Sequence, residues 1–168
     1  MPTTILSRRM EFFRDFYNIT EPIIGDESRA SEMDIKLVQY LLRCWAMSGG
    51  GATTVLRKEA ARIASKPGFV SGQFNPATRR VLQLFETDFE LQGDGVVLPV
   101  PSYRGSIDPF QMFRQKLGLL NCLFQAEIQR RMGNRPFGEI RSRIIRTMPA
   151  DLARALYPNV PYPLPETV

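Results

Sequence analysis

Histidine is absent from the 168 residues of this chain, and cysteine occurs only twice. The absence of histidine excludes a Ser-His-Asp triad, a Cys-His pair, an HExxH zinc site and general-base catalysis by histidine. Cys44 and Cys122 are too few for a zinc site of four thiolates, and both lie in apolar helical stretches, where free cysteine packs as a small hydrophobic residue. A disulfide between them is compatible with the sequence but not indicated, since a chain of this size needs no crosslink. We therefore expect a binding or structural protein with no catalytic residues, no metal and no cofactor.

Long apolar runs are also missing. No stretch of about 18 apolar residues occurs, so the sequence predicts no transmembrane helix and no membrane insertion. The segment from Met1 to Glu11 lacks the apolar run of about seven residues that a signal peptide needs. We therefore expect a protein made in the cytoplasm, which stays there or leaves as a component of a virion or an injection apparatus.

Acidic residues are scarce in the C-terminal half, so the basic charge gathers there. The chain holds 22 Lys+Arg against 17 Asp+Glu; residues 1–94 carry 12 of each sign, whereas residues 95–168 carry 10 basic and 5 acidic residues. Such a cluster can bind an acidic protein face or nucleic acid phosphates, or can simply be solvated. Nucleic acid is less favoured, because aromatic residues do not interleave the arginines as single-strand binders require. The candidate partner-binding residues, opposed nearby only by Glu139, are Arg130, Arg131, Arg135, Arg141, Arg143 and Arg146.

Hydrophobic periodicity predicts a mainly α-helical chain. Three helix starts carry capping signals: Ser31 with Asp34, Asn75 before Pro76, and Asp108 before Pro109. The expected helices cover residues 7–17, 31–48, 53–65, 75–89, 108–132, 137–147 and 149–157. The apolar stripe of the helix over 109–132 is wide enough for two neighbours, so it could also form a homo-oligomer interface.

Extended structure is expected at few places. Residues 96–100 are the best strand candidate, which Pro99 keeps short, and Ile23 with Ile24 forms a second short extended piece. Four prolines after residue 157 predict a polyproline-like tail over residues 158–168, which lies on a neighbouring surface or frays.

Two segments together resemble a known family. Residues 34–42 read DIKLVQYLL, and residues 72–85 read GQFNPATRRVLQLF. Their order and pairing resemble the peptidoglycan-binding-like domain family, whose members carry a D-V-x-x-V-Q-x-L-L-N helix followed by a D-G-x-F-G-P-x-T-x-x-A-V-x-x-F-Q element. The resemblance covers roughly residues 23–100 and implies a small three-helix module.

The residues of these segments have physical roles of their own. Gln39 is a polar side chain on an otherwise apolar helix, so we expect it to bond a neighbouring backbone group. Gly72 and Phe74 are expected to make a tight turn and to fill the core. Trp45 falls on the apolar helix face and is expected in the core rather than as a platform for a sugar.

The chain departs from the family pattern at several positions. Ser71 stands where the family has Asp before glycine, Asn75 stands where it has Gly before proline, and an extra helix lies between the two segments. Because the Asp-Gly turn helps to shape the ligand groove in glycan-binding members, the resemblance implies the fold more strongly than it implies glycan binding. A glycan groove beside the 71–76 turn would use four candidate residues, Tyr40, Gln73, Asn75 and Arg79.

An acidic stretch follows the second segment and contains Glu86, Asp88, Glu90 and Asp94. Glu86 and Glu90 share a helix face, which makes a carboxylate pair for glycoside hydrolysis conceivable. A calcium site is also conceivable, although the spacing is not that of an EF-hand loop. A solvated helix face is the simpler interpretation and the one we expect.

The sequence as a whole predicts a mainly α fold: a three-helix peptidoglycan-binding-like core with an N-terminal helix and a C-terminal helical extension. The expected divisions are an N-terminal arm (1–22), the core (23–107), helices that pack on the core (108–157) and the tail (158–168). The expected function is that of a non-catalytic structural or adaptor protein in a larger assembly, such as a phage tail or a contractile, type VI-like injection apparatus. A module that binds cell-wall peptidoglycan and a nucleic-acid-binding protein are the alternatives.

Overall fold

The computed structural model describes residues 2–5, 15–25, 30–49, 54–103, 106–107, 115–133 and 135–160. These residues are mainly helical, as the sequence predicts. They form six helices: α1 (Glu32–Ala46), α2 (Val55–Ala64), α3 (Pro76–Asp88), α5 (Lys116–Met132), α6 (Phe137–Thr147) and α7 (Ala150–Leu156).

The strands among the described residues are short, and they form only two-stranded antiparallel sheets. The extended piece at Ile23 is confirmed, because Ile23 pairs with Val97 of the expected 96–100 strand. That strand covers only two residues, before the prolines at 99 and 101. The pairs are β1 (Thr3–Ile5) with β2 (Phe16–Asn18), β3 (Ile23–Ile24) with β4 (Val96–Val97), and β5 (Ser102–Tyr103) with β6 (Ser106–Ile107).

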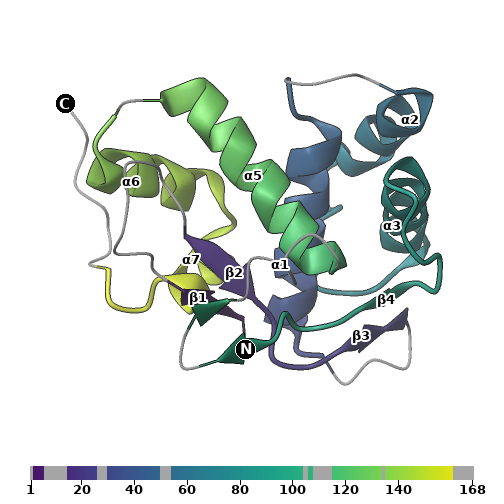
Figure 1. Cartoon of the computed structure of the whole chain (residues 1–168), viewed down its shortest axis with the longest axis horizontal. Coiled ribbons are helices and arrows are strands. Elements are labelled where there is room, and N and C mark those ends of the chain that lie inside the picture. Colours follow the sequence, from purple (N-terminus) through teal and green to yellow (C-terminus); the bar gives the residue numbers. More distant parts are fainter. Residues whose placement is uncertain are drawn as a thin grey trace.

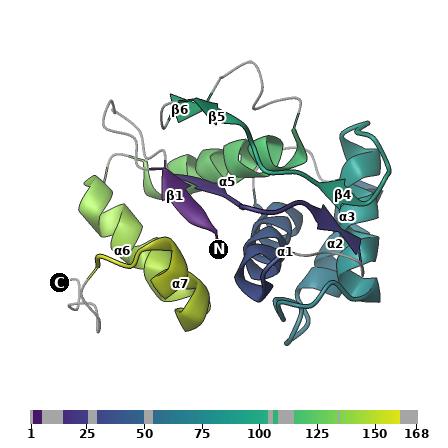
Figure 2. The same cartoon turned by 90° about the horizontal axis from the view of Figure 1, so that it is seen from below.

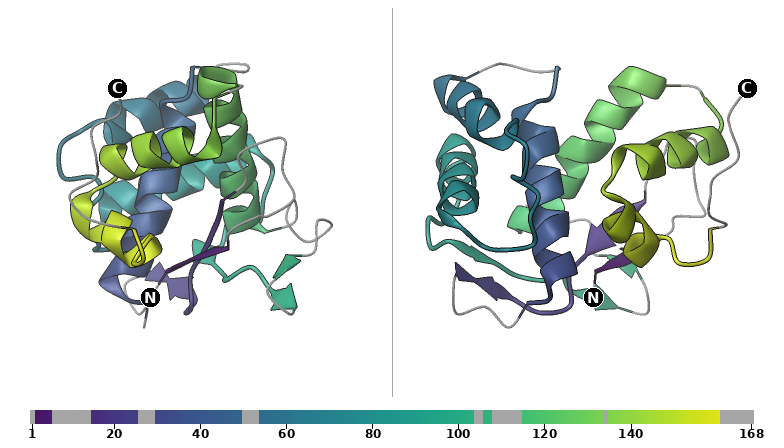
Figure 3. Two further views of the ribbon diagram at one scale, coloured as in Figure 1. Left: turned by 90° about the vertical axis from the view of Figure 1, so that its left-hand side faces the viewer. Right: turned by 180° about the vertical axis from the view of Figure 1, so that it is seen from behind.

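Helix α1 occupies the middle of the molecule (Figure 1). It contacts α2 and α3 on one side, and it contacts α5 and α7 as well. Seen from below and from behind, α6 and α7 lie on the opposite side of α1 from α2 and α3 (Figures 2 and 3). Because α1 has neighbours on both sides, ten of its 15 residues are buried.

The core is one connected cluster of buried apolar side chains drawn from all six helices and the strands. Trp45 lies in this core as expected, with its ring 5.2 Å from the ring of Phe85 and 6.2 Å from that of Phe89, measured between centroids. Both cysteines are free thiols. None of the described helices is both long enough and apolar enough to span a bilayer.

The capping signals place two helix starts correctly, those of α1 and α3. The Ser31 side chain accepts a hydrogen bond from the Asp34 N–H at the start of α1, and the Asn75 side chain accepts one from the Thr78 N–H at the start of α3. These caps depend only on residues three positions apart, which is why the sequence reveals them.

Two expected helices differ from the structure. The prediction of a helix over 7–17 is wrong at its C-terminal end, because Phe16 and Tyr17 lie in β2. Residues 6–14 are outside the described residues. The long helix expected over 108–132 begins only at Lys116, because the backbone at Gln115 is extended, with φ −106° and ψ 134°. The expected start at Asp108 and Pro109 lies outside the described residues.

Candidate functional site

The two segments that carry the family resemblance meet at Gln39, whose side chain is fully buried. Its Oε1 accepts a hydrogen bond from the Gly72 N–H (2.8 Å), and its Nε2 donates to the Gln73 carbonyl (2.9 Å) and to Thr78 Oγ1 (2.8 Å). The bond to backbone that the sequence predicts is therefore confirmed. We call this set of contacts the Gln39 clasp.

Gly72 is required for the turn inside the Gln39 clasp. Its φ is +83°, and a Cβ atom added there would come within 2.2 Å of Glu32 Cγ. Any other residue would strain the backbone and clash with the first turn of α1. The turn that the sequence places at Gly72 is thus fixed by both conformation and space.

The four glycan-groove candidates are not brought together. Gln73, Asn75 and Arg79 lie at the turn beside α3, but Tyr40 faces away, because it follows Gln39 and one residue is about 100° of rotation around a helix. Tyr40 is buried and its hydroxyl lies 3.4 Å from Thr147 Oγ1 in α6. The expectation that Tyr40 belongs to this groove is therefore wrong.

The other three candidates differ in what they can offer to a ligand. The Asn75 side chain is occupied by capping α3, since its Oδ1 accepts from the Thr78 N–H and from Thr78 Oγ1, both at 2.9 Å. Gln73 is exposed, and the Arg79 guanidinium lies 5.9 Å from the centroid of the Phe74 ring. Arg79 and Phe74 help to line a small hollow of about 230 Å³, together with Ile24, Gly25, Gln83, Gly93, Asp94 and Gly95.

Carboxylates of α5 and α6 form ion pairs with most of the arginines in the cluster. Arg130 and Arg131 both bond Glu127 at 2.7 Å, and Arg135 bonds Glu139 at 2.7 Å. Arg143 lies 3.5 Å from Glu139, and Arg146 is exposed on α6. The expectation that only Glu139 opposes these arginines is therefore wrong.

Arg141 has a structural partner far away in the sequence. Its guanidinium bonds both carboxylate oxygens of Asp15 at 2.7 Å, and the Asp15 side chain is only 1% exposed. Tyr157 also donates to Asp15, at 2.7 Å. The contact joins α6 and α7 to the segment just before β2, so the guanidinium of Arg141, which is 28% exposed, is engaged in an ion pair within the molecule.

The acidic stretch is only in part the solvated face that we expected, since Glu90 and Asp94 are exposed but Glu86 is not. Glu86 is buried and bonds the ammonium of Lys116, which also bonds Asp94 and the Val96 carbonyl. The hydrogen bond from Lys116 lowers the pKa of Asp94 below its usual value. Glu90, the other member of the supposed carboxylate pair, is exposed. The described residues contain no group of three or more metal-ligating side chains.

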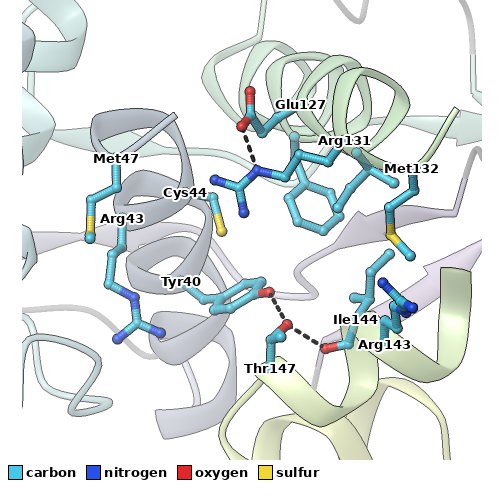
Figure 4. Close-up of a pocket in the computed structure, with 12 residues that line it drawn as sticks. Tyr40, Arg43, Cys44, Met47, Glu127, Arg131, Met132, Arg143, Ile144 and Thr147 are labelled. Atoms are coloured by element: carbon cyan, nitrogen blue, oxygen red, sulfur yellow. Dashed lines mark hydrogen bonds and ion pairs between the residues drawn. The ribbon is translucent and has the colours of Figure 1, made fainter. Parts of the chain in front are cut away.

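A cavity of about 450 Å³ opens between α1, α5 and α6, and we call it the α1–α5–α6 cavity (Figure 4). Apolar side chains make most of its walls, and charged groups lie among them. Its lining consists of Tyr40, Arg43, Cys44, Met47, Phe124, Glu127, Ile128, Arg131, Met132, Arg143, Ile144 and Thr147.

Two titratable side chains in the wall of this cavity, a thiol and a phenol, are held neutral. Burial raises the pKa of the Cys44 thiol to about 11 and raises the pKa of Tyr40 above its usual value. A thiol with a raised pKa is a poor nucleophile near neutral pH, because the thiolate is the reactive form. The cavity can therefore bind an apolar group, while its thiol and phenol stay uncharged.

Cationic groups lie around the same cavity. The Arg43 guanidinium lies 5.8 Å from the centroid of the Tyr40 ring, and Arg131 bonds Glu127 at 2.7 Å. The side chains of Arg131 and Arg143 are 57% and 47% exposed, so these charges reach the solvent. The α1–α5–α6 cavity thus combines apolar walls with a basic rim.

Glu127 separates this cavity from a second one of about 510 Å³, and it lines both. Its carboxylate accepts hydrogen bonds from Arg130, Arg131 and the Gly49 N–H, and the bond from Arg130 is the main reason that its pKa falls to about 2. The second cavity has walls of Trp45, Phe89 and Leu123. Its charged residues, Arg57, Asp88, Glu127 and Arg130, balance one another in sign.

The sequence identifies only a part of the α1–α5–α6 cavity. Arg131 and Arg143 belong to the predicted partner-binding cluster and do line it. The rest is missed, because the cavity combines residues from three helices whose packing is not encoded locally. A usable signal is the breadth of the apolar stripe on α5, whose residues Ile128 and Met132 pack against the main core and also line the cavity.

Known proteins add no comparison to this geometry. No family model, no curated protein and no solved structure matches the chain. The function proposed below is therefore derived from the residues of this chain.

Proposed function

We propose that the chain is a non-catalytic adaptor protein that binds a partner protein through the α1–α5–α6 cavity. The observation that carries the proposal is the combination of apolar walls, an uncharged thiol and phenol, and a basic rim in one cavity. A phage tail or a contractile injection apparatus, expected from the sequence, remains the proposed kind of assembly.

The composition of the cavity suits contact with a protein. Binding energy at protein interfaces concentrates in desolvated pockets, where aromatic residues, methionine and arginine are enriched. Ile128 and Met132, which are only partly buried, supply apolar surface that a partner side chain would remove from water. Phe124 and Ile144 in the cavity wall are already buried. Met47 lies at the cavity and is 50% exposed, so the walls continue onto the molecular surface.

Site-specific photo-crosslinking in the producing cells tests this proposal. A photoreactive amino acid replaces Met47 at the cavity, and the matched control carries it at Val55, which is 81% exposed on α2 and does not line the cavity. We expect Met47 to crosslink a defined protein that Val55 does not. Crosslinks that are identical from both positions, or absent from Met47, would contradict an adaptor role for this cavity.

Peptidoglycan binding is the second candidate, favoured by the hollow beside the 71–76 turn. Phe74 and Arg79 line that hollow, which gives an apolar ring next to a hydrogen-bond donor. Retention on insoluble peptidoglycan tests it: Arg79→Ala should reduce retention, whereas Lys58→Ala on α2 should not. Equal retention of both variants would count against this hollow.

Nucleic acid binding is not proposed. Five of the six arginines in the predicted cluster pair with Glu127, Glu139 or Asp15. These ion pairs neutralise part of the charge that a phosphate backbone would bind.

A further inference from the structure

We propose that the partner presents an acidic amphipathic helix to the α1–α5–α6 cavity, with an apolar side chain inside it and carboxylates on Arg43 and Arg143. This inference rests on the proposed function and adds the chemistry of the partner. It commits to a protein segment rather than to a small amphiphile or a nucleic acid.

The charge of the lining is the first argument. Among the charged residues that line the cavity, three are arginines (Arg43, Arg131 and Arg143) and one is a carboxylate (Glu127). That carboxylate is already shared by Arg130, Arg131 and the Gly49 N–H. The cavity therefore carries a positive excess, which is complementary to an acidic segment.

The contacts of two arginines are the second argument. Within the described ranges Arg43 forms no ion pair, and it is held over the Tyr40 ring at 5.8 Å. Arg143 lies 3.5 Å from Glu139, a carboxylate that Arg135 contacts more closely, at 2.7 Å. Both guanidinium groups can therefore bind a carboxylate of the partner, with the two parallel hydrogen bonds that arginine makes.

The position of these arginines is the third argument. Figure 4 shows Arg43 and Arg143 on opposite sides of the cavity, with Tyr40 and Thr147 between them. An apolar side chain with an acidic residue to either side matches this order of charges and walls. Because the walls are helices, the cavity suits an amphipathic helix laid in a groove, and Met47 and Met132 can adapt to its side chains.

Cys44 provides a reporter inside the cavity. Its thiol reacts slowly because its raised pKa leaves little thiolate, so its alkylation is followed at mildly alkaline pH. In the full chain carrying Cys122→Ala, the rate at which a maleimide alkylates Cys44 is measured without and with a synthetic amphipathic helical peptide. One peptide has a leucine face flanked by glutamates, and a second has the same leucines flanked by lysines. Sodium laurate, below its micellar concentration, is the small-amphiphile probe.

We expect the glutamate peptide to slow the alkylation of Cys44 and the lysine peptide to leave it unchanged. Reversing both charges, Arg43→Glu with Arg143→Glu, should weaken protection by the glutamate peptide at least about tenfold, which corresponds to about 1.4 kcal/mol. Lys58→Glu with Arg62→Glu on α2 is the matched control, since both side chains are exposed and the net charge changes equally. Circular dichroism checks that each variant is folded.

Several results would overturn the inference. One is that the two peptides protect Cys44 from alkylation equally, or that neither protects it. Another is that the charge reversal at Arg43 and Arg143 leaves protection by the glutamate peptide unchanged. A third is that laurate alone protects Cys44. The proposed function can fail separately. A crosslink from Met47 to a basic segment would preserve the adaptor role and refute the acidic helix. Protection by the glutamate peptide with no crosslink in cells would refute the adaptor role and leave the affinity of the cavity for an acidic helix intact.

Discussion

At the scale of the residue, Gln39 shows how one buried polar group joins two helices. Its amide satisfies the Gly72 N–H, the Gln73 carbonyl and the Thr78 hydroxyl at once. A buried donor or acceptor that loses its partner costs the free energy of its desolvation. The Gln39 clasp is therefore expected to stabilise the contact between α1 and the turn before α3.

Replacing Gln39 by alanine tests this role. We expect Gln39→Ala to lower the free energy of unfolding by about 2–4 kcal/mol, because it leaves backbone groups unpaired and opens a cavity. Urea denaturation measures the change. Gln83→Ala, at an exposed position of α3, should change stability by less than about 0.5 kcal/mol. Similar midpoints for the two variants would refute the role of the clasp.

Residues differ in how well the sequence predicts their roles. Ser31, Gln39 and Asn75 were assigned correctly, because a cap depends on near neighbours and a lone polar residue on an apolar face must find a partner. Glu86 and Arg141 were not, because their partners lie 30 and 126 positions away in the chain. Formal charge alone predicts that these two side chains are exposed to solvent.

At the scale of the element, tertiary contacts decide the structure of β2. The Tyr17 N–H donates to Asn121 Oδ1 at 2.7 Å, and Asn121 Nδ2 donates to the Tyr17 carbonyl at 2.9 Å. Thus α5 bonds one edge of the strand, while β1 pairs with the other. The sequence around Tyr17 has helical periodicity, but these two neighbours require extended backbone. Helix bodies such as α2 and α6 lack this competition and were predicted well.

Arg141 and Arg143 lie on the same helix and allow a matched comparison. We expect Arg141→Met to lower the free energy of unfolding by about 3 kcal/mol, because it leaves the buried Asp15 carboxylate without its cation. Arg143→Met should cost less than about 1 kcal/mol, since its ion pair is exposed. Urea denaturation of both variants gives the comparison. Equal losses of stability in the two variants would show that the ion pair between Arg141 and Asp15 is unimportant.

At the scale of the whole molecule, the N-terminal strands and the C-terminal helices close on each other. The Tyr17 and Tyr157 hydroxyls lie 2.6 Å apart, and Thr4 Oγ1 donates to the Leu156 carbonyl at 2.7 Å. The sequence predicts the mainly helical class, but not this closure, since it joins residues about 150 positions apart. The α1–α5–α6 cavity was missed for the same reason: its walls meet only after the chain has folded.

Closure of the molecule around buried tyrosines has a consequence at alkaline pH. Burial raises the pKa of Tyr17, Tyr40 and Tyr157 above the usual value near 10. The unfolded chain therefore loses these protons at lower pH than the folded chain does, so stability is full below about pH 10 and falls as pH rises further. We expect these three of the five tyrosines to ionise in one step with the loss of helical circular dichroism, as followed by phenolate absorbance. Tyr157→Phe should remove one phenol from that step. Ionisation of all tyrosines near pH 10, with the helical signal intact, would contradict the buried network that joins the two ends.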